Sequence, residues 1–507
     1  NGKAKNMKMV LAQYTIRSKQ EYIFRTNRMV EIAGASENIS QSWNILFTQA
    51  DKMGKKLRRV SKNIPFCMEE VKRLFDERKL NGIELFCGGG NDTVLYDSIE
   101  TYLEVNKAFS RFLLENYPGM IPMAVACEYS GDYDKDYANL MKQSDIEKNK
   151  MISGQSDFIL PFSMMDRTTF QPYSDIISIA ESSVRVTDEA KAKRKAGLKI
   201  REQDETVKLL DDLITKKGEE SLLAVVHADG NNMGSKISEM LTDKKDYDSC
   251  VNIMREFTAD TAKAFGKSGL DAMQKCQQQL KEDYKDKYDE KAFFFRKIIA
   301  DGDDMTFVCN ARFVMDYVGA YLEAVQNYNN KGEKEWRYSS CAGICIFHSH
   351  YPFARAYSLA EQACESAKKN VHGECIKEES WVDFHYIHNG VGGDLDQIRE
   401  HQGVSGCMAR PWRIGTKANT DRKDYSTLQI LADIMKENGV SRSDIKTIGS
   451  ELEDSYSYGK FELNRVYGHH RNLQNEIKEK LKIDKEEDLL PIIYDLSEVY
   501  DLWFVRK

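Results

Sequence analysis

The sequence lacks the features that mark several classes of protein. Its eleven cysteines include no C-x-x-C pair, so a structural zinc motif is not expected and the cysteines should be small buried residues in a reducing compartment. No His-Asp doublet occurs, which leaves an HD-type phosphohydrolase without a visible ligand set. The longest apolar runs, such as residues 222–226, have the length of a strand and fall far short of the roughly 20 residues of a membrane span. No signal peptide precedes Met7, so we expect a cytoplasmic protein without membrane association.

Positive charge is not in excess either. The net charge of -7 gives no electrostatic reason for tight, non-specific wrapping of nucleic acid, so any contact with a polynucleotide should be local. The length of 507 residues is enough for two or three domains, each with its own core.

One order of elements occurs twice along the chain: strand, helices, hairpin, helix, strand. Apolar alternation and turn residues predict the first copy at 9–16, 17–80, 83–96, 99–115 and 121–129, and the second copy at 221–228, 233–286, 293–310, 313–329 and 339–347. A repeated unit of this kind predicts an α+β protein with two ferredoxin-like, split βαβ domains.

The domain boundaries follow from this repeat. We expect a first unit with helical insertions at 7–185, a charged connector at 186–220, a second unit at 221–395 and a C-terminal helical domain at 396–507. Within the connector, the basic cluster at 191–195 could contact phosphate, although such a charge run is more often a solvated helix face.

Three aspartates mark a candidate catalytic and metal-binding centre in the second unit. Asp229 ends an apolar strand, and Asp303 and Asp304 occupy the turn of the hairpin. The first strand and the hairpin are neighbours in a split βαβ sheet, so these carboxylates can converge on Mg²⁺ or Mn²⁺ beneath a nucleoside triphosphate. The alternative is a surface turn, because Asp-Gly pairs are common turn residues.

Residues around these aspartates are candidates for nucleotide binding. Glycines allow backbone to approach phosphate closely, and a helix that begins near Met233 would direct its N–H groups at the same phosphates. Lys368 lies on a predicted helix and could reach a triphosphate, the alternative being an ordinary exposed lysine. The candidates in this unit are Gly230, Asn231, Asn232, Gly234, Gly302 and Lys368.

With these residues in view, the chain resembles the polymerase-like large subunit of type III CRISPR effector complexes, which makes cyclic oligoadenylates. ADGNNMG at 228–234, ADGDD at 300–304 and the segment 341–369 are similar to its catalytic second palm, and GGGND at 88–92 is similar to the hairpin of its first palm. The resemblance spans about residues 9–390 and extends more distantly to GGDEF nucleotide cyclases.

The resemblance implies roles for particular residues. Asp229 and Asp303 would be metal ligands, Asp304 would assist and Lys368 would contact phosphate. In the first palm, Asn91 stands where the second has Asp303 and Thr15 stands near the position of Asp229, so this palm should bind the acceptor nucleotide without catalysis. Its nucleotide-binding candidates are Gly89, Gly90, Asn91 and Asp92.

The implied function is an Mg²⁺- or Mn²⁺-dependent nucleotidyltransferase in antiviral defence. It would join nucleoside triphosphates, with ATP the expected substrate, into a cyclic or short oligonucleotide messenger, and RNA or CRISPR-type proteins would be its partners. The chain departs from the family at Asp301, where a glycine is usual, and at Asn231, where an acidic residue is frequent, which leaves product and base preference open.

Two other functions stay open. A palm pair could sense a nucleotide or RNA without turnover. A templated polymerase is suggested by the Gly-Asp-Asp triplet at 302–304, but nothing resembles fingers or thumb domains.

Overall fold

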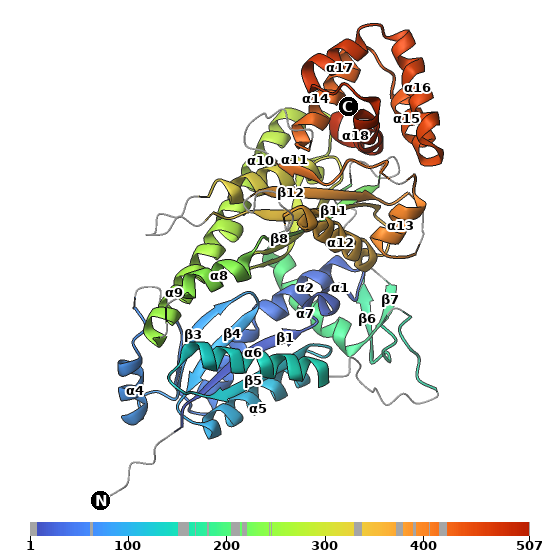
Figure 1. Cartoon of the computed structure of the whole chain (residues 1–507). Coiled ribbons are helices and arrows are strands. Elements are labelled where there is room, and N and C mark those ends of the chain that lie inside the picture. The colour runs from blue at the N-terminus through green and yellow to red at the C-terminus, as the bar shows by residue number, and fades with distance from the viewer. Residues whose placement is uncertain are drawn as a thin grey trace, which may run out of the picture. The chain divides into compact units, whose positions relative to one another are not determined.

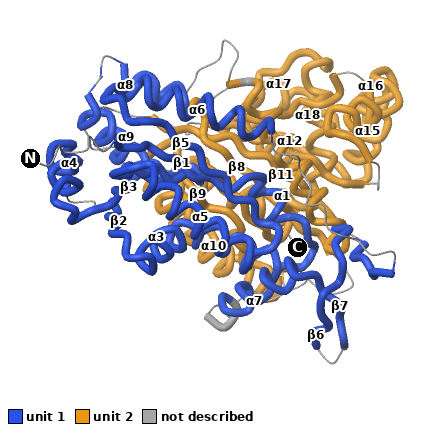
Figure 2. Tube along the Cα trace, turned by 90° about the horizontal axis from the view of Figure 1, so that it is seen from below, with its two compact units in different colours: residues 1–208, 233–262 blue, residues 209–232, 263–507 orange. Residues whose placement is uncertain are grey.

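The structure is a computed structural model of the whole chain. It describes residues 8–60, 64–150, 162–167, 169–179, 182–203, 213–214, 221–242, 244, 246–328, 337–371, 379–388, 392–404, 406–414 and 423–505. The chain folds into two compact units, residues 1–208 with 233–262 and residues 209–232 with 263–507 (Figure 2).

Unit 1 is built on a five-stranded sheet in the order β2-β3-β4-β1-β5. Strand β1 lies antiparallel between β4 and β5, and β3 and β4 form a hairpin. This is the strand order of a split βαβ unit, as predicted. The strands are β1 (Val10–Arg17), β2 (Leu57–Arg58), β3 (Gly82–Gly88), β4 (Asn91–Tyr96) and β5 (Ile121–Glu128).

Helices cover both faces of this sheet because β1 alternates between two buried faces. Leu11 points into a hydrophobic cluster with helices α4 and α6. Tyr14 points the other way, where its ring meets Phe109 of α5 edge-on at a centroid distance of 5.7 Å. The helices from the first part of the chain are α1 (Lys19–Phe24), α2 (Met29–Ser40), α3 (Ser42–Lys52), α4 (Met68–Asp76), α5 (Ile99–Asn116) and α6 (Tyr133–Lys150).

Two helices that follow the first strand of the second repeat belong to unit 1. The sequence predicts helices at 233–286 within the second unit, but α8 (Met233–Leu241) and α9 (Tyr247–Thr261) are grouped with the first. The reason is burial: α9 inserts Tyr247, Val251 and Met254 into the hydrophobic cluster of the first sheet. Amphipathic spacing predicts a helix but does not specify which sheet its apolar face covers.

Part of the predicted connector is also an integral helix of unit 1. Helix α7 (Asp188–Gln203) packs so closely on α2 that a Cβ at Gly34 would lie 1.8 Å from the carbonyl oxygen of Lys193, and one at Gly197 would lie 1.8 Å from that of Val30. A small antiparallel ribbon, β6 (Asp175–Ile179) and β7 (Ser182–Val186), precedes α7. Residues 204–212 and 215–220 of the connector lie outside the described residues.

Unit 2 contains a six-stranded sheet in the order β13-β12-β11-β8-β10-β9. Figure 1 labels its neighbouring strands β12, β11 and β8. Four neighbouring strands of this sheet, β11-β8-β10-β9, repeat the strand order of the first sheet, so the prediction of two split βαβ sheets is confirmed. The strands are β8 (Leu222–Gly230), β9 (Phe295–Asp301), β10 (Asp304–Asn310), β11 (Ser340–His348), β12 (Ser380–Tyr386) and β13 (Trp412–Ile414).

Helix α12 packs on β11, β8 and β12, and α10 packs on α11. Gly343 of β11 allows α12 to approach, since a Cβ there would lie 1.9 Å from the carbonyl oxygen of Ala360. The helices around the sheet are α10 (Gly269–Tyr284), α11 (Val314–Gln326), α12 (Phe353–Val371) and α13 (Leu395–His401), with a π-helix at Ala262–Ser268 and a 3-10 helix at Glu290–Phe293.

A helical region ends the chain, as predicted. Its helices are α14 (Tyr425–Glu437), α15 (Arg442–Asp454), α16 (Tyr456–His469), α17 (Leu473–Leu481) and α18 (Glu486–Val499), with a short π-helix at Tyr500–Phe504. The buried Arg410 joins this region to the sheet. It pairs with Asp495 at 3.1 Å and with Glu498, both on α18, and it stacks on Phe384 of β12.

Strand β13 lies inside the range predicted as helical, yet it extends the sheet because Trp412 is buried beside β12.

None of the described helices combines the length and apolar character that crossing a bilayer requires.

Candidate active site

The three predicted aspartates come to one end of the second sheet. Strand β8 carries Asp229 next to its last residue, and the β9–β10 hairpin carries Asp303 in its turn and Asp304 at the start of β10. The hairpin reverses tightly because Gly302 adopts the left-handed region, with φ of 64°. Met305 pairs with Ala228, so Asp304 and Asp229 are the next residues on the two adjacent strands. Backbone register therefore brings the positions of Asp229 and Asp304 together. The oxygens of the three carboxylates do not all lie within 4.8 Å of one another, so joint binding of one ion requires their side chains to rotate.

The charges of this centre interact strongly. Burial, and after it the negative charge of Asp229, raises the pKa of Asp303 to about 6, while Lys368 opposes the shift. Lys368, in the last turn of α12, donates to Oδ2 of Asp229. Burial lowers the pKa of Lys368, but the ion pair with Asp229 outweighs burial and the net shift is upward. A half-buried acidic group with one nearby lysine is an electrostatic environment that favours a bound cation.

Sequence reasoning missed His227, which lies two residues before Asp229 and on the same face of β8. Its Nδ1 lies 3.4 Å from Oδ1 of Asp304, 3.4 Å from Oγ1 of Thr306 and 3.5 Å from the hydroxyl of Tyr357. Burial lowers the pKa of His227 to about 4, so the imidazole is neutral at pH 7. It therefore adds no positive charge beside the Asp304 carboxylate. Strand alternation was the signal that could have found it.

The residues after β8 have different environments. Asn231 is buried and donates through Nδ2 to Oγ of Ser339 at 3.0 Å and to the carbonyl of Glu379 at 3.2 Å. These bonds fix the end of β8 against the adjacent segments. Gly230 is buried, and Asn232 has a left-handed φ of 57°. Gly234 is exposed in the first turn of α8, and a Cβ there would meet open space.

The hairpin of the first sheet closes at the same register as the second, but both of its turn residues have left-handed φ, whereas only Gly302 does in the second turn. Gly89 and Gly90 form its turn, with φ of 58° and 71°, and the closing pair is Gly88 with Asn91, as Asp301 with Asp304 closes the second turn. Asn91 therefore occupies the position of Asp304. The sequence comparison, which had placed it at the position of Asp303, was wrong on this point. Thr15 lies opposite Asn91, as Asp229 lies beside Asp304. Asp92 points into the unit and is fully buried.

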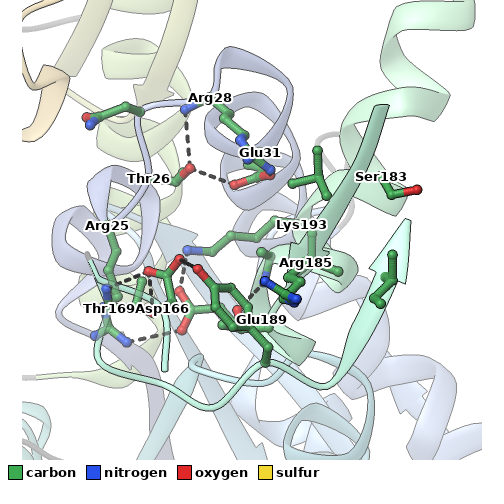
Figure 3. A pocket seen from close by; sticks show the side chains of 17 residues that line it. Arg25, Thr26, Arg28, Glu31, Asp166, Thr169, Ser183, Arg185, Glu189 and Lys193 are labelled. Atoms are coloured by element: carbon green, nitrogen blue, oxygen red, sulfur yellow. Dashed lines mark hydrogen bonds and ion pairs between the residues drawn. The ribbon is translucent and has the colours of Figure 1, made fainter. Parts of the chain in front are cut away.

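A separate cavity of about 640 Å³ lies in unit 1 (Figure 3). Arg25, Arg28 and Lys193 line it together with Glu31 and Glu189. Lys193, from the basic cluster considered as a phosphate contact, is almost fully buried and donates to Glu189 and to the carbonyl of Tyr22. The cluster is thus not one solvated face of a helix.

Two sheets with the split βαβ strand order, the second with aspartates at its hairpin end, define a pair of palm-type domains. Residues 222–375 match the family model described as Cas10/Cmr2, second palm domain. The predicted resemblance to the palm pair of the type III CRISPR large subunit is therefore confirmed.

Solved structures of Csm1–Csm4 cassettes have the same fold. The crystal structure of a cassette in complex with one ATP aligns with a TM-score of 0.56 at 11% identity, covering 99% of this chain and 70% of that chain. A cassette in complex with cA3 aligns with a TM-score of 0.50 at 10% identity, covering 97% and 70%. A cassette in complex with cA4 aligns at 11% identity with a TM-score of 0.44, which is too low to indicate a shared fold, and this chain covers 63% of its length. The chain thus spans about two thirds of the length of these structures. No curated protein sequence matches it.

Proposed function

We propose that this protein is a divalent-metal-dependent nucleotidyltransferase that joins nucleoside triphosphates, principally ATP, into a cyclic or short oligoadenylate with release of pyrophosphate. The observation that carries the proposal is the position of Asp229 beside Asp304, with Asp303 in the adjoining turn and Lys368 paired to Asp229. The match to the Cas10/Cmr2 second palm supports it. So do the ATP and cA3 bound by cassettes of the same fold.

The donor set fits Mg²⁺ or Mn²⁺ in kind, because it consists of carboxylate oxygens, and the pKa of Asp303 is raised first by burial and then by the charge of Asp229. Asp229, Asp303 and Asp304 would hold the metal. When bound, a divalent cation neutralises triphosphate charge and stabilises the attacking and leaving oxygens. The thiol of Cys341, opposite Asp229 on β11, is buried and takes no part in this donor set.

Lys368 and the hairpin backbone would place the nucleotide. The ammonium group of Lys368 can exchange its contact with Asp229 for a phosphate oxygen, because an ammonium group binds phosphate as a point charge. Gly302 has no side chain to obstruct a phosphate that approaches the turn. Asn231 would act as a positioning residue, since its amide fixes the end of the strand that carries Asp229.

In the proposed reaction, a ribose hydroxyl oxygen of one nucleotide attacks the α-phosphorus of another. The new phosphodiester bond forms as the bond to the β-phosphate bridging oxygen breaks, so pyrophosphate leaves and the hydroxyl proton is released to a carboxylate of the centre. Rate enhancement would come from placement and charge compensation rather than from a covalent enzyme intermediate.

The first palm is proposed to bind a nucleotide without catalysis. Thr15, Gly90 and Asn91 hold the three positions at which the second palm has carboxylates, so none of these positions supplies a carboxylate to a catalytic metal. By analogy with the Csm1–Csm4 cassettes, we propose a partner of the Csm4 type. From the resemblance to the type III CRISPR large subunit, we propose RNA as activating signal and a role in antiviral signalling.

The test is to incubate the purified protein with each of the four ribonucleoside triphosphates and either Mg²⁺ or Mn²⁺. We expect pyrophosphate release with ATP, and mass spectrometry should identify an oligoadenylate product. The matched control is Asp303→Asn, which should bind ATP weakly and release no pyrophosphate. Calorimetric binding of ATP without pyrophosphate release under every metal, RNA and partner condition would refute the proposed activity and indicate a nucleotide-sensing palm pair.

A further inference from the structure

An irregularity in β3 brings two side chains of the first unit to the same face. In a regular strand Glu84 and Cys87, three positions apart, would point to opposite faces. The register of β3 against β4 shifts between Glu84 and Phe86, so the strand contains a β-bulge. Leu85 and Phe86 consequently both enter the hydrophobic cluster on one side, which leaves Glu84 and Cys87 on the other. β-Bulges often re-aim side chains in this way at functional sites.

The partner strand supplies a third group. Cys87 pairs with Asp92 across the β3–β4 hairpin, and one ligand atom from each of Glu84, Cys87 and Asp92 lies within 4.8 Å of the others. These three residues are hereafter the hairpin triad. Their atoms are close enough for a small adjustment to bring all three around one ion.

Asp92 is the independent observation that indicates a ligand. Its side chain is 0% exposed, and neither carboxylate oxygen accepts a hydrogen bond from any described residue. Burial, followed by the charge of Glu84, raises the pKa of Asp92 well above its usual value. A buried carboxyl group without hydrogen bonds is costly unless an ion or a proton compensates it.

Surrounding groups hold the triad in shape and leave it accessible. Glu84 accepts a hydrogen bond through Oε2 from the Val60 amide at 2.7 Å. Arg255 of α9 donates to the carbonyls of Leu85 at 2.6 Å and Glu84 at 2.9 Å, which fixes the bulge. Cys87 is exposed, so it provides an entry path. Support of ligands by surrounding hydrogen bonds is typical of metal sites.

We propose that the hairpin triad binds a thiophilic divalent cation, with Zn²⁺ as the ion its chemistry fits best. One thiolate and two carboxylates are ligands that zinc accepts, and the exposed side of Cys87 leaves a fourth position for water. The site lies in the first palm and is separate in sequence and in chemistry from the carboxylate centre of the second. The positive charge of Arg59 acts against a cation here, but its guanidinium is engaged by Oδ1 of Asn44 at 2.7 Å and by the ring of Phe47 at 4.4 Å.

The competing explanation is that Glu84 and Asp92 share a proton and bind no metal. Cobalt titration of the chelator-treated, full-length protein distinguishes the two. We expect Co²⁺ to produce a near-ultraviolet thiolate-to-cobalt charge-transfer band that added Zn²⁺ removes. Cys87→Ser should abolish the band. Asp92→Asn and Glu84→Gln should weaken Co²⁺ binding at least about tenfold.

Two matched controls locate the signal. Cys67→Ser, a partly exposed cysteine of the same unit outside the triad, should leave the band unchanged. Asp303→Asn should also leave it unchanged, which separates this site from the proposed catalytic centre. Zn²⁺ should raise the melting temperature of the unchanged protein by more than that of Cys87→Ser, in which only the carboxylate centre of the second palm can bind it. Absence of a band at excess Co²⁺, or a band that persists in Cys87→Ser, overturns the proposal and leaves the shared proton as the explanation.

Discussion

The hairpins of the two sheets close at the same register but differ in turn backbone and in chemistry. Each turns through a glycine with left-handed φ, Gly89 at 58° in the first and Gly302 at 64° in the second. Beside the closing pair stands Thr15 in the first sheet and Asp229 in the second. The second hairpin therefore presents carboxylates at the open end of its sheet, and the first presents neutral side chains there.

The acidic residue of the first hairpin lies one position further along its strand. Asp92 follows Asn91 and, because successive residues of a strand point to opposite faces, its carboxylate turns into the unit rather than toward the open end. A shift of the acidic residue by one position along the strand therefore gives the two hairpins different kinds of site, although the fold is the same. The fold provides the position, and residue identity at the strand end decides the chemistry.

The largest expected effect tests this comparison directly. Asp229→Asn and Asp303→Asn should each reduce the initial rate of ATP-dependent pyrophosphate release by about 10²- to 10³-fold or more, because each removes a negative charge from the metal-holding centre. The matched change in the first sheet, Thr15→Val, should leave the rate near that of the unchanged protein. An equal loss in Thr15→Val would show that the two strand ends are not chemically distinct.

A smaller effect is expected at Lys368. Lys368→Met keeps the aliphatic stem and removes the charge, so the KM for ATP should rise and kcat/KM should fall by about 10- to 100-fold, the range of a lost charge-assisted hydrogen bond. Lys369→Met is the control, since Lys369 is 69% exposed and pairs with Asp396 instead. Steady-state kinetics at several ATP concentrations measure both. Similar values for the two variants would remove Lys368 from the site.

The raised pKa of Asp303, about 6, predicts that metal binding at the second palm depends on pH. A carboxylate must be ionised to bind a cation, so Mn²⁺ affinity should rise about tenfold between pH 5 and pH 7. Because the pKa is higher in the folded state than the ordinary 3.8, the metal-free protein should instead become more stable as the pH falls from 6 toward 4. Calorimetric Mn²⁺ titrations at three pH values, repeated with Asp303→Asn, check the assignment. An affinity independent of pH in both proteins would contradict it.

The smallest expected effect is on stability and concerns Gly302 and Gly234, which the sequence analysis gave the same nucleotide-binding role. Gly302→Ala should lower the free energy of unfolding by about 1 to 2 kcal/mol, because alanine is strained at a φ of 64°. Gly234→Ala should not destabilise the protein, since a Cβ there meets open space. Urea denaturation followed by circular dichroism measures both. A loss of activity in Gly234→Ala at unchanged stability would indicate that backbone at this position approaches the nucleotide.

Much of this arrangement could be predicted from the sequence. Apolar alternation in segments such as 222–228 and the Gly-Asp turns give both strand orders, and the order places Asp229 next to the hairpin. The rest depends on tertiary packing. Nothing in the amphipathic pattern of α9 specifies that it covers the first sheet, and nothing in the sequence of β3 marks the bulge that turns Glu84 toward Cys87. The charge run around Lys193 predicts a solvated side chain, but in the structure this side chain is buried and forms an ion pair with Glu189.

The passage of α8 and α9 into unit 1 limits how this protein can be divided. The chain changes unit after residues 208, 232 and 262. A break near residue 220 would deprive the N-terminal piece of Tyr247, Val251 and Met254, and a break after 262 would take β8 out of the middle of the second sheet. No single cleavage therefore yields two intact halves. Because the chain passes between the units three times, a recombination event at a single position cannot transfer one intact palm without the other.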